Sequence, residues 1–228
     1  MKIKCFQTGM LGVNTYYVCD EKNKKGFIVD PGGYSAKLIN AIKEDGCDIE
    51  YIILTHGHGD HIGGISFLKE ENGNVKEKLK RDLDEGKLEL AEEFKDIKLV
   101  ACIHEKEFLA DPNMNASLEC CGTRIALSAD IWVDDCDSLK IGDMELKFIH
   151  TPGHTPGGMC ILIGDTLFSG DTLFKLSIGR TDFPGGSFAE IKKSIHEKLF
   201  VLPDYVTVYP GHMGTTTIGI EKRSNPFV

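Results

Sequence analysis

The order of the predicted elements indicates an α/β (α+β) fold in which two β-sheets pack together and helices cover their outer faces. Three observations predict this architecture. The first half of the chain gives strands, a helix, a strand and a helix, and the second half repeats that order. Hydrophobic residues make up 41% of the 228 residues, which is enough for a sizeable core. Linkers rich in proline or serine are absent, so we expect a single domain over residues 1–228.

The first half is predicted to begin with two strands that a charged turn separates. Asp30-Pro31-Gly32-Gly33 forces a turn after the second of them. Ser35 is a suitable N-cap for the following helix, in which Leu38, Ile39 and Ile42 share one face. The predicted elements are strands at 14–19, 26–30, 49–54 and 97–102, a helix from 35 to about 44, and a short helix at 104–109.

The second half is predicted to repeat this pattern with shorter strands. Its helix starts at Ser187 and runs through Leu199, with Ile191 and Ile195 at helical spacing. We expect the strand at 206–209 to be the last one. The predicted strands lie at 131–133, 145–150, 159–163, 166–169 and 206–209.

Residues 69–96 differ from the rest of the chain because Lys, Glu, Asp and Arg dominate them. Val75, Leu79 and Leu83 recur at spacing four, which indicates one or two surface helices broken near Gly86. A charged, helical and solvated insertion at about 69–96 is therefore favoured over a helix that binds a partner.

The overall composition excludes several classes of partner. The formal net charge of -9 argues against a nucleic acid held by phosphate contacts, and no apolar stretch is long enough to span a bilayer. The first residues lack the apolar core of a signal peptide, so we expect a cytoplasmic location. The eight cysteines contain no C-x-x-C pair. Of these cysteines, only Cys120 and Cys121 are candidates for contact with a substrate. The sequence gives no indication of the oligomeric state.

The strongest functional signal is a cluster of histidines and a carboxylate directly after a predicted buried strand. The segment is Thr55-His56-Gly57-His58-Gly59-Asp60-His61. Its two glycines free the backbone, so that the neighbouring side chains can converge. Further candidates follow other predicted strands, at positions where loops leave a rigid scaffold. These candidates are His154, Asp171 and His212.

These residue types in this arrangement predict a metal site. Neutral imidazole and carboxylate are ligands that borderline divalent ions such as zinc prefer. Taken alone, His154 or His212 is more often a hydrogen-bonded surface residue, and Asp171 fits a turn or an N-cap equally well. The cluster outweighs this, because no structural role requires so many ligands in sequence. If one carboxylate is shared, the set suffices for two divalent ions. Zinc is the expected metal, and iron or manganese is also compatible with these ligands.

The segment from Thr55 to His61 resembles the T-H-x-H-x-D-H motif of the metallo-β-lactamase superfamily, and the resemblance covers nearly the whole chain. It implies an αββα sandwich of two mixed β-sheets with helices on the outer faces. Within the superfamily, the chain is most similar to the small, single-domain branch of the glyoxalase II-like hydrolases. The other segments that carry the resemblance are Asp30-Pro31-Gly32-Gly33, Thr151-Pro152-Gly153-His154-Thr155, Ser169-Gly170-Asp171-Thr172-Leu173-Phe174, Gly179-Arg180-Thr181-Asp182-Phe183-Pro184-Gly185-Gly186, Tyr209-Pro210-Gly211-His212 and Ser224-Asn225-Pro226-Phe227.

The resemblance implies hydrolysis of thioesters of 2-hydroxy acids, or of related acyl esters, by a hydroxide that bridges two metal ions. Asp60 would also steer this hydroxide as a catalytic residue. Arg180 stands where a cationic residue contacts the carboxylate of the thiol carrier, although a structural salt bridge accounts for it equally well. A small, anionic thioester is therefore the expected partner. The implied ligands are His56, His58 and His154 for one ion, Asp60, His61 and His212 for the other, and Asp171 as the bridge.

Similarity to other branches of the superfamily leaves alternatives. Persulfide dioxygenases, which use a single iron, resemble the chain through the same histidine cluster and the segment from Arg180 to Phe183. Phosphodiester hydrolysis is less favoured because of the acidic charge. A flavin-partnered di-iron branch is disfavoured because it has a glutamate where His58 stands. Glyoxalase II proper has a helical domain that supplies much of its glutathione site, and the chain ends soon after His212, so the thiol carrier stays open.

Overall fold

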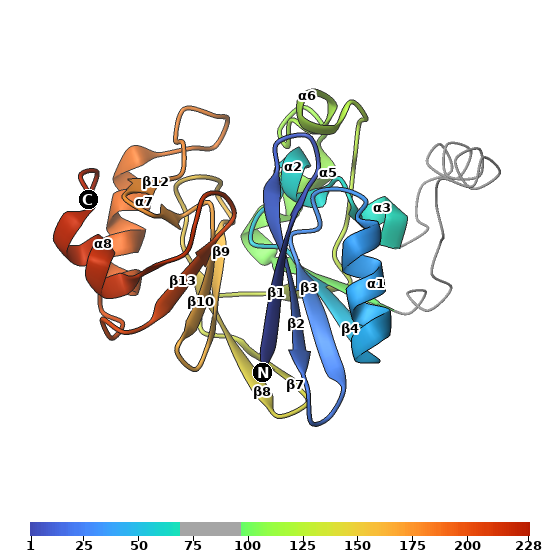
Figure 1. The fold of residues 1–228 in the computed structure, drawn as a ribbon. Helices are drawn as coiled ribbons and strands as arrows, with labels where there is room; N and C mark the ends of the chain where they lie inside the picture. The colour runs from blue at the N-terminus through green and yellow to red at the C-terminus, as the bar shows by residue number, and fades with distance from the viewer. Residues whose placement is uncertain (69–96) are drawn as a thin grey trace.

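The computed structural model describes residues 1–68 and 97–228, so the expected insertion at 69–96 lies outside the described residues. Two six-stranded sheets lie face to face, and helices cover the outer face of each (Figure 1). The predicted αββα sandwich of two mixed sheets is confirmed. Among the described residues, no helix combines the length and the apolar character needed to cross a membrane.

The first sheet has the order β1-β2-β3-β4-β5-β6. Its first three strands pair antiparallel, whereas β3, β4, β5 and β6 pair parallel. The parallel part brings the carboxyl ends of four strands to one edge. The strands are β1 (Lys2–Thr8), β2 (Val13–Asp20), β3 (Lys25–Val29), β4 (Asp48–Ile53), β5 (Lys98–Cys102) and β6 (Ile131–Val133).

The second sheet has the order β14-β13-β10-β9-β8-β7. Only β10 and β13 pair parallel, so these two strands end at the same edge. The strands are β7 (Ser138–Ile141), β8 (Met144–His150), β9 (Met159–Ile163), β10 (Thr166–Gly170), β13 (Thr207–Pro210) and β14 (Thr216–Thr217), and a separate hairpin consists of β11 (Leu173–Phe174) and β12 (Ser177–Ile178).

Hydroxyl side chains begin the three longer helices. The hydroxyls of Ser35, Ser187 and Thr217 accept hydrogen bonds from backbone amides three residues on. The helix predicted at 187–199 continues beyond α7 as a short π-helical turn, η3. The helical elements are α1 (Ala36–Asp45), α2 (Gly59–Ile62), α3 (Ile65–Leu68), η2 (Ile103–Glu105), α5 (Lys106–Ala110), α6 (Ser117–Cys121), α7 (Phe188–Ser194), η3 (Ile195–Leu199) and α8 (Ile218–Ser224).

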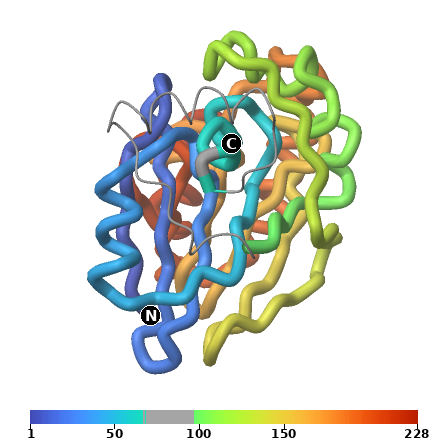
Figure 2. Tube along the Cα trace, turned by 90° about the vertical axis from the view of Figure 1, so that its right-hand side faces the viewer, coloured from blue at the N-terminus to red at the C-terminus, as the bar shows by residue number. Residues whose placement is uncertain are grey.

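Three apolar clusters fill the spaces between the layers. One lies between α1 and the first sheet, a second lies between the two sheets, and a third lies between the second sheet and α7, η3 and α8. Neighbouring residues of β2 divide between the first two clusters, with Tyr17 in one and Tyr16 in the other. Figure 2 shows these layers from the side of α1, with the second half of the chain behind the first sheet. Each central strand is therefore buried on both faces.

The ends of the chain differ from the sequence prediction. Strand β1 was not predicted, because Lys2 and Lys4 leave this half-exposed edge strand without a continuous apolar pattern. The prediction that the strand at 206–209 is the last is wrong, because β14 and α8 follow it. Strand β14 has only two residues, and Gly219 near the start of α8 weakens the helical pattern there.

Candidate metal centre

The seven predicted ligands all lie at one edge of the sandwich, near α2 in Figure 1. His56 and His58 follow β4, and Asp60 and His61 lie in α2. The remaining three follow strands of the second sheet, with His154 after β8, Asp171 after β10 and His212 after β13. Both sheets therefore supply side chains to the same place.

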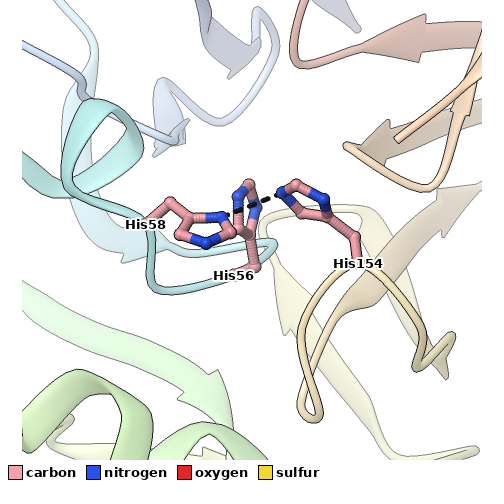
Figure 3. A group of neighbouring side chains, drawn as sticks. All are labelled: His56, His58 and His154. Atoms are coloured by element: carbon pink, nitrogen blue, oxygen red, sulfur yellow. Dashed lines mark hydrogen bonds between the residues drawn. The ribbon is translucent and has the colours of Figure 1, made fainter. Parts of the chain in front are cut away.

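Three histidines form the first ligand group, drawn in Figure 3. The ligand atoms of His56, His58 and His154 lie within 4.8 Å of one another, and all three side chains are buried. Nδ1 of His58 lies 2.9 Å from Nε2 of His154, so these nitrogens face the same point (Figure 3). Such convergence of imidazole nitrogens provides the kind of ligands that a divalent ion such as zinc requires.

Asp60, His61 and His212 form the second group, again within 4.8 Å. Nε2 of His212 lies 3.2 Å from Oδ2 of Asp60. Asp171 lies between the two groups, since its carboxylate oxygens are 3.4 Å from Nε2 of His61 and 3.6 Å from Nε2 of His154. The two groups with one carboxylate between them fit a dinuclear site.

Buried atoms without hydrogen-bond partners test whether this pocket fits metal ions. Among the described residues, Nε2 of His56 and His61 and Oδ1 of Asp171 are buried and accept or donate no hydrogen bond. Buried polar atoms are normally satisfied, so a concentration of unsatisfied ones at a single place requires an explanation. All three are of a type that binds divalent cations, so the donor set fits bound metal.

Asp30 orients one of these ligands, and the sequence prediction missed this role. Its Oδ2 accepts hydrogen bonds from Nδ1 of His61 at 3.0 Å and from Oγ1 of Thr55 at 2.6 Å. Its Oδ1 accepts one from the backbone amide of Thr55 at 2.8 Å. Asp30 also lies near His56 and His61 as a further possible ligand group, but its two oxygens are already engaged. A carboxylate on Nδ1 leaves Nε2 of His61 free for metal.

A backbone carbonyl has the same effect on His154, whose Nδ1 donates to the carbonyl oxygen of Arg180 at 2.7 Å. His150 donates through Nε2 to the carbonyl oxygen of Pro156 at 2.9 Å. The ring of the exposed His104 stacks on that of His150. Neither belongs to a ligand group of the described residues.

Burial and neighbouring charges give the ligands different proton affinities. Burial, with the charge of His154, lowers the pKa of His58 to about 3, and burial also lowers the pKa of His56. Burial opposes protonation of His61 as well, but the carboxylates of Asp171, Asp60 and Asp30 outweigh it and raise its pKa to about 10. His56 and His58 in the first group are therefore neutral, whereas His61 in the second holds a proton that an ion must displace.

Glycine is required at two points where the ligands approach the backbone. A Cβ atom on Gly211 would overlap Oδ1 of Asp171 and Cε1 of His61. A Cβ atom on Gly170 would overlap the side chain of Thr55, and its φ of +50° also favours glycine. These two glycines allow the ends of β10 and β13 to reach the histidine loop.

A cleft of about 640 Å³ opens onto the ligands. Arg180 lies on its wall with 65% of the side chain exposed, and its Nε and Nη2 donate to Asp182 at 2.9 and 2.7 Å. Cys120 also lines the cleft, whereas the Cys121 thiol donates to the carbonyl oxygen of Gly59. Other residues on the wall are Leu11, Ala116, Glu119, Phe174, Ser177, Ile178, Phe183 and Met213. The cleft thus combines an apolar wall with one guanidinium near the ligands.

Comparisons with known proteins agree with this geometry. A family model described as the metallo-beta-lactamase superfamily matches residues 8–212. The hydroxyacylglutathione hydrolase GloC of Haemophilus influenzae is 36% identical over 218 residues, which cover 92% of this chain and 89% of that protein. The probable metallo-hydrolase YqgX of Bacillus subtilis is 34% identical over 231 residues, which cover 100% and 98%.

Solved structures agree over the same length. The BLEG-1 B3 metallo-beta-lactamase superposes with a TM-score of 0.81 at 34% identity, covering 99% of both chains. TTHA1623 in a di-iron-bound form superposes with a TM-score of 0.74 at 27% identity, covering 99% of this chain and 100% of that one. The similarity therefore extends over both sheets.

Proposed function

The chain belongs to the metallo-beta-lactamase superfamily, and we propose that within it the protein hydrolyses thioesters of 2-hydroxy acids or related acyl esters. The observation that carries the proposal is the carboxylate of Asp171 between two convergent ligand groups at the floor of a cleft. The 36% identity to a hydroxyacylglutathione hydrolase supports the choice of substrate class.

The proposal assigns two divalent ions to this protein. Zinc is the metal we expect from the nitrogen-rich donor set, with iron or manganese as alternatives. The similarity to a protein solved in a di-iron-bound form supports the inclusion of iron. The proposed ligands are His56, His58 and His154 for one ion, Asp60, His61 and His212 for the other, and Asp171 for both.

The proposed chemistry divides between the ions and the chain. Bound ions of this kind lower the pKa of a coordinated water to about 7 and polarise a carbonyl oxygen. Asp60 keeps its charge, because the neighbouring His61 and His212 outweigh the effect of burial and hold its pKa below the usual range. Its carboxylate is therefore an acceptor that orients the attacking water.

Residues on the cleft wall would select the substrate. The guanidinium of Arg180 stacks over the ring of Phe183 at 4.2 Å and pairs with the exposed Asp182. An exposed ion pair contributes little free energy, so a substrate carboxylate can replace Asp182 at small cost. The apolar side chains of Phe174 and Ile178 would cover the rest of the substrate. The expected partner is therefore a small anionic thioester, without nucleic acid or membrane.

A cytoplasmic location is part of the proposal. All eight cysteines are free thiols, and free thiols are typical of a reducing compartment.

A substrate panel with metal analysis tests the proposal. Purified protein is offered a 2-hydroxyacyl thioester of glutathione, a neutral aryl ester, a β-lactam and an aryl phosphodiester, and bound metals are counted. The β-lactam is included because a structure at 34% identity is a metallo-beta-lactamase. We expect the thioester to be hydrolysed fastest, by protein with two ions per chain. Hydrolysis of the phosphodiester alone would contradict the proposed substrate class.

A mononuclear-iron persulfide dioxygenase is the second candidate. It is favoured by the position of Arg180 and Phe183 on the cleft wall, because the segment that contains them also resembles those enzymes. Oxygen uptake with glutathione persulfide separates the two candidates. Oxygen uptake by protein with one iron per chain, without thioester hydrolysis, would support the dioxygenase and contradict the hydrolase.

A further inference from the structure

Glu105 is a buried carboxylate that joins two loops near the ligands. It is the last residue of η2 and is only 1% exposed. Its Oε1 accepts a hydrogen bond from the backbone amide of Gly57 at 2.8 Å. Its Oε2 accepts one from the backbone amide of Gly157 at 2.7 Å. One side chain therefore holds two segments that lie far apart in the sequence.

These two segments carry the complete three-histidine group. Gly57 lies between His56 and His58, and Gly157 follows His154 in the loop after β8. Figure 3 shows the three histidines approaching from these two loops, with the His58–His154 contact across the gap. Both of these hydrogen bonds come from loops of the three-histidine group, and neither comes from Asp60, His61 or His212 of the second group.

The packing around Glu105 leaves little freedom for another arrangement. A Cβ atom on Gly157 would overlap the backbone nitrogen and Oε2 of Glu105. A Cβ atom on Gly57 would lie 2.9 Å from Cδ2 of Leu109, in the helix that follows Glu105. Both loops therefore lie directly against the segment that carries the carboxylate.

We propose that Glu105 is a positioning residue for metal at the three-histidine group, fixing the separation of the two loops that carry its ligands. The proposal rests on the metal site of the proposed function. The two amides donate to different oxygens of one side chain, so the positions of both loops depend on the same residue. Partners that hold ligands in place typically change metal affinity 10- to 100-fold when they are replaced.

The geometry requires two acceptors, and this selects a carboxylate. Glutamine has the same shape as glutamate but only one acceptor oxygen. In Glu105→Gln, the NH₂ group would therefore face the amide of either Gly57 or Gly157, donor against donor. Aspartate keeps both oxygens but is one methylene shorter, so in Glu105→Asp it reaches only one loop. Each variant should release one of the two loops.

Paired backgrounds make the test specific to one ligand group. In His212→Ala, the second group lacks a ligand, so tight zinc binding reports the three-histidine group. In His154→Ala, the three-histidine group is incomplete, so binding reports the second group. Glu105→Gln and Glu105→Asp are made in both backgrounds, and the zinc Kd is measured by competition with a chromophoric chelator.

Two matched controls separate positioning from loss of stability. Glu107→Gln removes an exposed carboxylate two residues away in α5. Glu221→Gln removes a carboxylate that is also 1% exposed and accepts from the amide of Leu176 and from Asn225, away from the ligands. The melting temperature of each metal-free variant is measured alongside the Kd.

We expect Glu105→Gln to raise the zinc Kd 10- to 100-fold in the His212→Ala background and less than threefold in the His154→Ala background. Glu107→Gln should leave the zinc Kd unchanged in both backgrounds. Glu221→Gln should lower the melting temperature without a loss of zinc affinity that is confined to the His212→Ala background. An equal change in both backgrounds, or no change with either Glu105 variant, would overturn the positioning role. Fewer than two bound ions in the wild-type protein would instead count against the proposed dinuclear function. That count is measured separately from the comparison of Glu105 variants in the two backgrounds.

Discussion

Replacing Asp30 by asparagine keeps the shape of the side chain and removes one acceptor from the support of His61. The carboxylate accepts three hydrogen bonds, two from Thr55 and one from Nδ1 of His61. With the asparagine oxygen at the position of Oδ2, its NH₂ group faces the amide of Thr55. With the amide flipped, the NH₂ group faces His61 and favours the tautomer whose Nε2 carries the proton.

In either orientation of the asparagine amide, its NH₂ group takes the place of an acceptor, so one buried hydrogen-bond donor loses the acceptor it has in the wild-type protein. A hydrogen bond to a charged group contributes about 1.5–3 kcal/mol, so we expect the metal-free Asp30→Asn variant to lose about that much stability. For a protein of this size, each kcal/mol corresponds to about 2–4 °C, which gives a melting temperature lower by about 3–12 °C. The wrong tautomer of His61 should also weaken metal binding to the second ligand group about 10- to 100-fold.

Thermal unfolding of metal-free protein and a zinc competition titration measure these two effects. Asp20→Asn is the matched control, because Asp20 is also buried and accepts hydrogen bonds from Asn23 and from the amide of Asp143, beside the turn between β2 and β3. It should lower the melting temperature and leave both zinc affinities unchanged. If Asp30→Asn binds the second ion as tightly as the wild type, Asp30 does not orient His61 for metal.

Three further predictions concern metal and substrate binding. Asp171→Ala should lower the affinity for both ions at least tenfold, whereas His212→Ala should lower mainly the affinity for one ion. Full metal content and near-normal turnover of Asp171→Ala would refute the assignment of Asp171 as the bridge. Arg180→Ala should raise KM for anionic thioesters roughly tenfold with metals retained, and an equal loss on neutral esters would make Arg180 structural. Because the pKa of metal-free His61 is raised to about 10 and that of His58 is lowered to about 3, protons compete for the second group at pH 7. Its zinc affinity should rise with pH up to about 10 and its ion should leave first on acidification, whereas loss of both ions at one pH would contradict this.

The side chains that gather at the metal centre could be predicted from the sequence because their pattern is local. Four of them lie within six residues, from His56 to His61, and the others follow recognisable strands. The layers could be predicted for a related reason, since each buried strand leaves an apolar run of its own. The seven residues predicted as ligands are therefore found together, and their binding of metal stays a prediction.

The supporting residues could not be predicted, because their roles depend on which strands are neighbours. Asp30 reads as a turn residue until β3 is placed beside β4, where it meets the amide of Thr55. Glu105 lies 48 residues from Gly57 and 52 from Gly157, and nothing in its own segment indicates either contact. Arg180 could be placed near the cleft, but its pairing with Asp182 required the side-chain geometry.

Each ligand group takes side chains from both halves of the chain, and this has a consequence for the lifetime of the protein. His58 and His154 are 96 residues apart, and Asp60 and His212 are 152 residues apart. An ion in either group would therefore close a long loop and act as a cross-link between the two sheets. In the chain-entropy account, a cross-link over about 100 residues stabilises a protein by about 4.7 kcal/mol. Metal supply would then control how often the sheets separate, so that metal starvation would expose the chain to proteolysis as well as limit catalysis.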